Sequence, residues 1–161
     1  MKFLSGEEEK IALEYLAEAA EAAAFSTCGR SQCGSLIVKN YAVIGKGYNS
    51  PPNSLESQRR CSYIKDSYHK KVTDKTCCVH AEQRAIMDAL QKNPDKLSGS
   101  RLYFIRLDEK GKSSRAGKPY CTICSKMALD SGIAEFVLWH EEGICVYDTV
   151  EYNELSFRYR E

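Results

Sequence analysis

The sequence predicts an α/β fold in which helices pack against a sheet. Its 161 residues fall within the roughly 100–200 residues of one ordinary domain, and 43% hydrophobic with 28% charged residues is a globular composition. A helical pattern comes first, two short strand patterns follow, and helices and strands alternate from residue 78 onward. Such alternation favours a sandwich whose last strands run parallel through right-handed crossovers.

The first part of the chain predicts one helix and one hairpin. Residues 6–24 carry apolar side chains at helical spacing, and Ser5 and Glu8 have the spacing of a capping box. Residues 34–38 and 42–47 are short apolar runs separated by a brief polar connection, which is typical of an antiparallel hairpin.

A long polar connection and several further elements follow the hairpin. Residues 53–78 are rich in Lys and Arg, and loops of this length in a small domain are usually functional or disordered. The remaining pattern predicts a helix over 78–91, a strand over 101–107, a second basic loop over 108–118, a helix over 121–131 stopped by Gly132, a strand over 134–139, and a shorter element after Gly143.

Net charge and cysteine content narrow the functional class. The formal net charge of +1 argues against a strongly cationic nucleic-acid binder. The eight cysteines suit a disulfide framework only in a secreted chain, yet residues 1–9 lack the apolar stretch of a signal peptide. No apolar run approaches the roughly 20 residues of a membrane helix. We therefore expect a cytoplasmic protein without membrane attachment, whose thiols are reduced and in part bind metal.

Two short motifs combine ligands for a metal ion. They are His80-Ala81-Glu82 at the start of the second predicted helix and Pro119-Tyr120-Cys121-Thr122-Ile123-Cys124 at the start of the third. Cys121 and Cys124 lie three residues apart on a helical turn, so both sulfurs face one side. One imidazole and two thiolates suit Zn²⁺, and three protein ligands leave a position for water, as in catalytic zinc sites.

Glu82 adds a candidate proton carrier to this group. Two positions along an ideal helix correspond to a rotation of about 200°, so His80 and Glu82 converge only over the helix end. A carboxylate there, beside a water whose pKa is lowered to about 7 by zinc, is able to take a proton from that water and deliver it to a substrate.

Further segments occur in the order expected of a known family. They are Cys33-Gly34-Ser35-Leu36-Ile37-Val38, Ile44-Gly45-Lys46-Gly47-Tyr48-Asn49, His80-Ala81-Glu82-Gln83-Arg84-Ala85-Ile86 and Ser131-Gly132-Ile133. With the two motifs above, they resemble the zinc-dependent cytidine and deoxycytidylate deaminase superfamily over about residues 6–140, although Tyr120 separates Pro119 from Cys121 where the family signature joins them. The Gly-Tyr-Asn turn and the long insert before His80 are most similar to the deoxycytidylate deaminase branch.

The resemblance implies a fold, a reaction and a set of site residues. The implied fold is a three-layer α/β/α cytidine-deaminase-like sandwich with a mixed central sheet of about five strands, formed by residues 1–161 as one domain and commonly assembled as a homo-oligomer. The implied reaction is hydrolytic deamination of a cytosine-containing pyrimidine nucleotide, with dCMP giving dUMP and ammonia as the first choice. The implied site comprises His80, Cys121 and Cys124 as zinc ligands, Glu82 as the catalytic acid and base, Asn49 on the sugar, the Ala81 backbone on the pyrimidine edge, and Pro119 with Tyr120 at the pocket wall.

Other functions use the same residues. A deaminase acting on cytosine or adenine within RNA or single-stranded DNA would need the same four site residues and a path for flanking nucleotides, which the near-neutral charge disfavours. A non-catalytic zinc protein is the alternative of another class, and a Cys-x-x-Cys pair alone also suits redox chemistry or half of a structural zinc site. Glu82 argues against the non-catalytic zinc protein, because a structural site has no use for a carboxylate over an open coordination position. The His-x-Glu motif upstream, at the start of a second helix, argues against a lone Cys-x-x-Cys pair.

The remaining cysteines and the basic loops leave two questions open. Some deoxycytidylate deaminases carry a second, structural zinc, for which the candidates here are Cys28, Cys33, Cys61, His69, Cys77 and Cys78, whereas Cys33 and Cys78 also suit a buried core. Arg30, Arg59, Arg60 and Arg115 are candidates for binding a nucleotide phosphate or a polynucleotide backbone if they face the pocket. Tyr63, Tyr68 and Trp139 are candidates for stacking on a base, although core packing is the expected role of Trp139.

Overall fold

The architecture is a mixed sheet between two layers of helices. The computed structural model describes residues 1–115 and 117–160, and among these the strands form a seven-stranded sheet in the order β1-β7-β6-β4-β2-β3, with β5 paired to β4. The strands are β1 (Lys2–Phe3), β2 (Cys33–Lys39), β3 (Ala42–Tyr48), β4 (Arg101–Leu107), β5 (Ser113–Ser114), β6 (Glu135–His140) and β7 (Gly143–Asp148). The helices are α1 (Gly6–Ala23), α2 (Ala81–Lys92), α3 (Thr122–Asp130) and α4 (Thr149–Arg158).

The strand pairings confirm the predicted hairpin and the predicted parallel pair. β2 and β3 are antiparallel, and the two residues that join them, Asn40 and Tyr41, both have positive φ, which matches the twist of a tight hairpin turn. β4 and β6 are parallel, as the strand–helix–strand order around α3 predicts.

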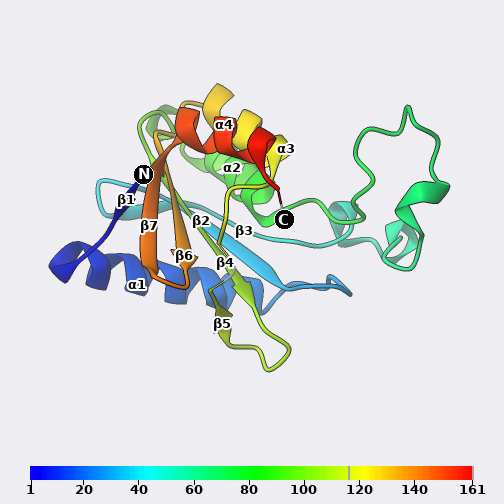
Figure 1. Cartoon of the computed structure of the whole chain (residues 1–161), viewed down its shortest axis with the longest axis horizontal. Helices are drawn as coiled ribbons and strands as arrows, with labels where there is room; N and C mark the ends of the chain where they lie inside the picture. Colours follow the sequence, from blue (N-terminus) through cyan, green and yellow to red (C-terminus); the bar gives the residue numbers. More distant parts are fainter. Residues whose placement is uncertain (116, 161) are drawn as a thin grey trace.

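Helices cover both faces of the sheet (Figure 1). α1 lies alone on one face, while α2, α3 and α4 lie together on the other. The alternation along β4 shows how the two cores share a strand: Leu102 and Phe104 belong to the core under α2–α4, and Tyr103 and Ile105 belong to the core under α1. Both faces are covered, so every position in the middle of the strand is apolar.

Close helix–sheet packing depends on glycines in the hairpin. A Cβ on Gly34 would lie 1.9 Å from the Ala19 carbonyl oxygen of α1, and a Cβ on Gly47 would lie 2.2 Å from the Ala81 carbonyl oxygen of α2. Both distances are far below van der Waals contact. The absent side chain at Gly47 therefore lets the start of α2 rest directly on β3.

The structure corrects three details of the predicted elements. The sheet has seven strands among the described residues rather than about five, because the short β1 and β5 and the full strand β7 join it. The shorter element expected after Gly143 is β7 followed by a ten-residue helix, α4. Ser5 does precede α1, but its side chain makes no capping hydrogen bond, so the capping-box spacing does not form a capping box.

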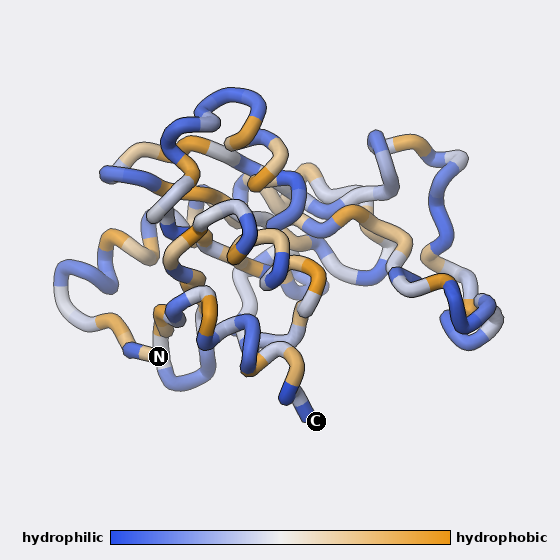
Figure 2. The backbone as a smooth tube through the Cα atoms, turned by 90° about the horizontal axis from the view of Figure 1, so that it is seen from above, coloured by the Kyte–Doolittle hydropathy of each residue, from blue (hydrophilic) through white to orange (hydrophobic). Residues whose placement is uncertain are grey.

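The segment between β3 and α2 extends away from the sandwich (Figure 1), and it is mostly hydrophilic (Figure 2). Its regular structure in the described chain consists of single 3-10 turns, at Pro52–Ser54, Glu56–Gln58 and Lys65–Ser67, and an isolated bridge between Ser50 and Val79. No helix of the described residues is long and apolar enough to span a bilayer.

Candidate active site and cysteine cluster

The two predicted metal-binding motifs meet where α2 and α3 begin. His80 is the residue before α2, and Cys121 is the residue before α3. The Nδ1 atom of His80 lies 3.2 Å from the Sγ of Cys121 and 3.2 Å from the Sγ of Cys124. All three donor atoms lie within 4.8 Å of one another, and both thiols are buried. One imidazole and two thiols converging on one point fit a zinc ion by number and by chemistry.

The electrostatics of this group favour a thiolate at Cys121. The hydrogen bond from the Cys124 thiol lowers the pKa of Cys121 to about 4. Burial opposes this shift, and the hydrogen bond and charge of His80 add to it. The hydrogen bond with Cys121 reciprocally raises the pKa of His80 to about 9 against the effect of burial. The backbone N–H of Cys124 also donates to the Cys121 sulfur, at 3.4 Å. A helix N-terminus stabilises negative charge, so its position also favours a thiolate ligand.

Glu82 is buried beside the three donors. Only 5% of its surface is exposed, and burial raises the pKa of its carboxyl to about 7, with Cys121 adding to the rise and His80 opposing it. The same carboxyl interacts with the Cys124 thiol. His80 and Glu82 thus converge over the start of α2, as expected from their spacing. A carboxyl group with a pKa near neutrality is able both to accept and to donate a proton.

Asn49 is bonded into the loops around the site. Its Oδ1 atom accepts hydrogen bonds from the Ser26 hydroxyl (2.7 Å) and the Cys33 backbone N–H (2.8 Å), and its Nδ2 atom donates to the Ser31 carbonyl (2.9 Å). An amide nitrogen carries two hydrogens, so one N–H of Asn49 is not used by these bonds. Asn49 therefore holds the approach to β2 and retains one donor.

A cavity of about 250 Å³ opens beside His80. Asn49 and Tyr120 also line it. Ala81 and Pro119 are buried, and neither is among the described residues that line the cavity. The structure thus brings three of the predicted site residues, His80, Asn49 and Tyr120, to this cavity. The other predicted site residues are buried and are not among its described lining: Ala81, Glu82, Pro119, Cys121 and Cys124.

Arg106 is a neighbour of the site that sequence reasoning missed. Its Nη2 atom donates to the Tyr120 hydroxyl at 2.8 Å, and its Nε is buried without a hydrogen-bond partner among the described residues. Arg106 lies opposite Cys33 in the β2–β4 pairing. The signal that would reveal it is strand register, which a single sequence does not contain.

The basic candidates divide into two groups. Arg30 and Arg60 line the cavity beside His80, together with Tyr63 and two cations not predicted, Lys65 and Lys75. The other candidates lie elsewhere. Arg59 pairs with Glu56 at 2.5 Å, and Arg115 lies over the ring of Trp139, 5.6 Å from its centroid. Tyr68 contacts Tyr63 edge to face, and Trp139 packs against the core under α1.

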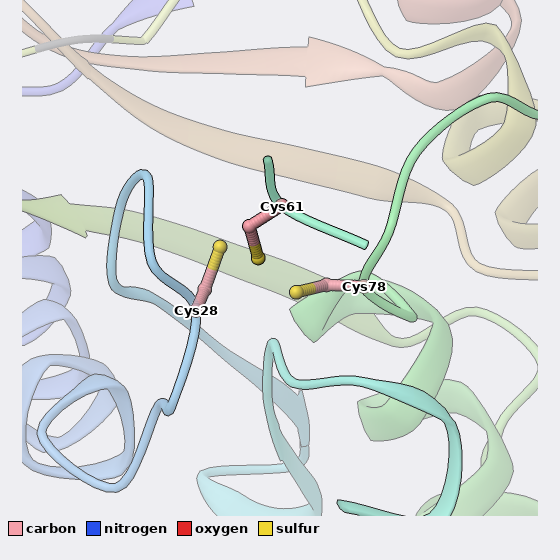
Figure 3. Close-up of side chains that lie close together, drawn as sticks. All are labelled: Cys28, Cys61 and Cys78. Carbon is pink, nitrogen blue, oxygen red and sulfur yellow. The ribbon is translucent and has the colours of Figure 1, made fainter. Parts of the chain in front are cut away.

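Three further cysteines converge near the cavity (Figure 3). Cys28, Cys61 and Cys78 have sulfur atoms within 4.8 Å of one another, and the sulfurs point toward a common centre. The Cys77 sulfur lies 3.6 Å from that of Cys61. We call Cys28, Cys61, Cys77 and Cys78 the cysteine cluster.

The remaining candidates for a second metal lie outside this cluster. Cys33 is buried in β2, with its sulfur 3.6 Å from the Ser31 hydroxyl. His69 accepts a hydrogen bond at Nδ1 from the Lys71 backbone N–H. Neither belongs to a metal-ligand group among the described residues.

Comparison with known proteins agrees with this geometry. Residues 8–140 match the family described as the cytidine and deoxycytidylate deaminase zinc-binding region. The deoxycytidylate deaminase of Mycobacterium phage D29 is 30% identical over 129 residues, which cover 76% of this chain and 89% of that protein.

Two solved structures share the fold. The dCMP deaminase of cyanophage S-TIM5 in complex with dCMP and dUMP has a TM-score of 0.56 at 22% identity, covering 83% of this chain and 82% of its own. The cytidine deaminase of Burkholderia pseudomallei has a TM-score of 0.57 at 16% identity, covering 87% of this chain and 94% of its own. The chain therefore belongs to the cytidine and deoxycytidylate deaminase family and is a zinc-dependent hydrolytic deaminase.

Proposed function

We propose that this deaminase acts on deoxycytidylate, converting it with water into deoxyuridylate and ammonia. The observation that carries the proposal is the buried Glu82 carboxyl packed beside the donors of His80, Cys121 and Cys124. The relatives support the choice of nucleotide, because one is a deoxycytidylate deaminase and another forms a complex with dCMP and dUMP.

The zinc ligands and Glu82 divide the chemistry between them. His80, Cys121 and Cys124 would hold a zinc ion, which when bound supplies a Lewis acid that acidifies water. Glu82 takes a proton from the attacking water and delivers it to the ring nitrogen of cytosine. The same carboxyl later assists the departure of the amine as ammonia. Burial keeps its pKa near neutrality, so that each transfer is available at neutral pH.

Asn49 and Tyr120 would orient the substrate. The N–H of Asn49 that its loop contacts leave unused is a donor for a sugar oxygen. The Tyr120 hydroxyl accepts from Arg106, so its own hydrogen is available to an acceptor in the cavity. Ala81, at the start of α2, would offer backbone groups to the pyrimidine edge, and Pro119 would set the path of the chain into Tyr120.

A substrate panel tests this proposal. Ammonia release is measured from cytidine, deoxycytidine, their monophosphates, and single-stranded cytosine- and adenine-containing oligonucleotides. The expected result is fastest turnover of deoxycytidylate. Faster turnover of an oligonucleotide would favour a polynucleotide deaminase instead, and zinc binding without turnover of any substrate would favour a non-catalytic zinc protein.

We also propose that the cysteine cluster holds a second, structural zinc. Three thiols around one point, with a fourth thiol, that of Cys77, 3.6 Å from one of them, form a donor set that zinc prefers. We expect about two zinc ions per chain by elemental analysis and about one in Cys61→Ser, whereas Cys145→Ser, in the sheet core, keeps two. One zinc ion in the unmodified chain would contradict this proposal and leave the catalytic site unaffected.

Self-association is a further expectation. Met87 and Leu90 on α2 are 41% and 46% exposed, and exposed apolar side chains on one helix suit a homo-oligomeric contact. Light scattering of the full chain is expected to give a multiple of 18.2 kDa. A mass of one chain across the working concentration range would exclude it.

A further inference from the structure

The cavity beside His80 has a strongly one-sided charge. Four cationic side chains line it: Arg30, Arg60, Lys65 and Lys75. None of the described residues that line this cavity is an Asp or a Glu. Such a wall gives no charge attraction to a neutral deoxynucleoside, whereas it attracts an anionic group.

These cations are not neutralised by neighbours. No ion pair between described residues involves any of the four, in contrast to the nearby pair of Arg59 with Glu56. Arg30 donates instead to a neutral acceptor, the Cys61 carbonyl oxygen, from Nη2 at 2.8 Å and from Nε at 3.2 Å. The charge of the wall is therefore available to a ligand.

Three of the four cations lie next to residues of the cysteine cluster in the sequence. Arg30 follows Cys28 by two residues, Arg60 directly precedes Cys61, and Lys75 precedes Cys77 by two residues. The backbone N–H of Arg60 donates to the Cys77 sulfur at 2.9 Å. Apart from the bridge between Ser50 and Val79 near its two ends, the segment that carries most of these residues has only single 3-10 turns. Between those ends, the converging cysteines and the hydrogen bonds of Arg30 to Cys61 and of Arg59 to Thr27 hold its cations near one wall.

We propose that the cysteine cluster builds an anion subsite in the cavity beside His80, and that this subsite takes the 5′-phosphate of a mononucleotide. The inference rests on the proposed function and adds the residues that distinguish nucleotide from nucleoside. A phosphate monoester carries close to two negative charges near neutral pH and accepts several hydrogen bonds, which an arginine fork and nearby ammonium groups satisfy. The cluster thus acts on substrate selection as well as on folding.

Product binding tests the subsite without relying on turnover. Calorimetric titrations compare dUMP with deoxyuridine, and the measured quantity is the ratio of their affinities. Removing a charged hydrogen bond in Arg30→Gln is expected to lower this ratio about tenfold or more. Lys70→Gln, on the same segment but not among the described cavity-lining residues, is the matched control and keeps the ratio of the unmodified chain.

Variants of the cluster test its part in the subsite. Cys61→Ser, or Cys28→Ser if the first variant does not fold by circular dichroism, is expected to lower the same ratio about tenfold. Cys145→Ser is expected to keep the affinity ratio of the unmodified chain. Cys61→His retains a zinc ligand and is expected to restore most of the ratio that Cys61→Ser loses. A folded cluster variant with an unchanged ratio would overturn the role of the cluster, and an unchanged ratio in Arg30→Gln would overturn the subsite.

The outcomes separate this inference from the proposed function. A chain that deaminates none of the cytosine substrates but prefers dUMP over deoxyuridine through Arg30 would keep the subsite and lose the proposed function. If the chain deaminates deoxycytidylate, but Arg30→Gln leaves the ratio of dUMP to deoxyuridine affinity unchanged, the proposed function is kept and the subsite is lost.

Discussion

Replacing Asn49 with alanine is expected to destabilise the protein before it affects any substrate contact. The Asn49 side chain makes three hydrogen bonds, to Ser26, Cys33 and Ser31, and it is only 7% exposed. Each neutral hydrogen bond contributes about 0.5–1.5 kcal/mol, and the buried N–H of Cys33 loses its side-chain acceptor. The free energy of unfolding should therefore fall by about 2–4 kcal/mol.

Urea unfolding, followed by the fluorescence of the single tryptophan, Trp139, measures this loss. For a slope of about 2 kcal/mol per molar urea, the midpoint moves down by about 1–2 M. Asn93→Ala is the graded control, because Asn93 donates one side-chain hydrogen bond, to the Ile44 carbonyl, and should lose about 1 kcal/mol. Equal midpoints in the two variants would mean that the three bonds of Asn49 stabilise the fold no more than one bond does, and would leave Asn49 with a role in substrate binding alone.

Three further predictions concern catalysis, metal binding and packing. Glu82→Gln keeps the side-chain volume but removes the proton carrier, so turnover should fall about 10²–10⁴-fold with zinc content unchanged, and loss of zinc would instead make Glu82 a ligand. Cys121→Ala removes one of three donors, so zinc at the site where α2 and α3 begin should be lost together with activity; retained zinc would show that Cys121 is not needed to hold it. Gly34→Ala places a Cβ 1.9 Å from the Ala19 carbonyl oxygen, which should cost about 2–3 kcal/mol and lower the melting temperature by about 5–10 °C; an unchanged melting temperature would mean that α1 shifts freely.

The parts of the site that sequence reasoning found are those set by local spacing. Cys121 and Cys124 share a helical turn, and His80 and Glu82 flank the start of another helix, so each motif is organised over a few residues. The comparisons confirm the family and the fold. The individual roles of these residues stay predictions for the experiments above.

The edges of the sheet and the arginines were harder to predict. β1 and β5 are two residues long, which is too short for a periodic pattern, and they exist because β7 and β4 offer them a partner. Among the four candidate arginines, only Arg30 and Arg60 line the cavity beside His80. Arg59, Arg60 and Arg115 belong to the two basic loops and Arg30 to a short polar connection, and composition does not show which of these segments faces the cavity.

Local patterns in the chain already specify the alternating α/β order, the His-x-Glu and Cys-x-x-Cys motifs, and the excess of cations before α2. Which of these groups meet depends on the packing of the folded chain. Packing of α2 and α3 on one face of the sheet brings His80 to Cys121, although 41 residues separate them. Convergence of Cys28, Cys61 and Cys78 is likewise a property of chain closure. The physical reason is that local periodicity specifies faces and turns, whereas contacts between distant segments depend on how the whole core packs.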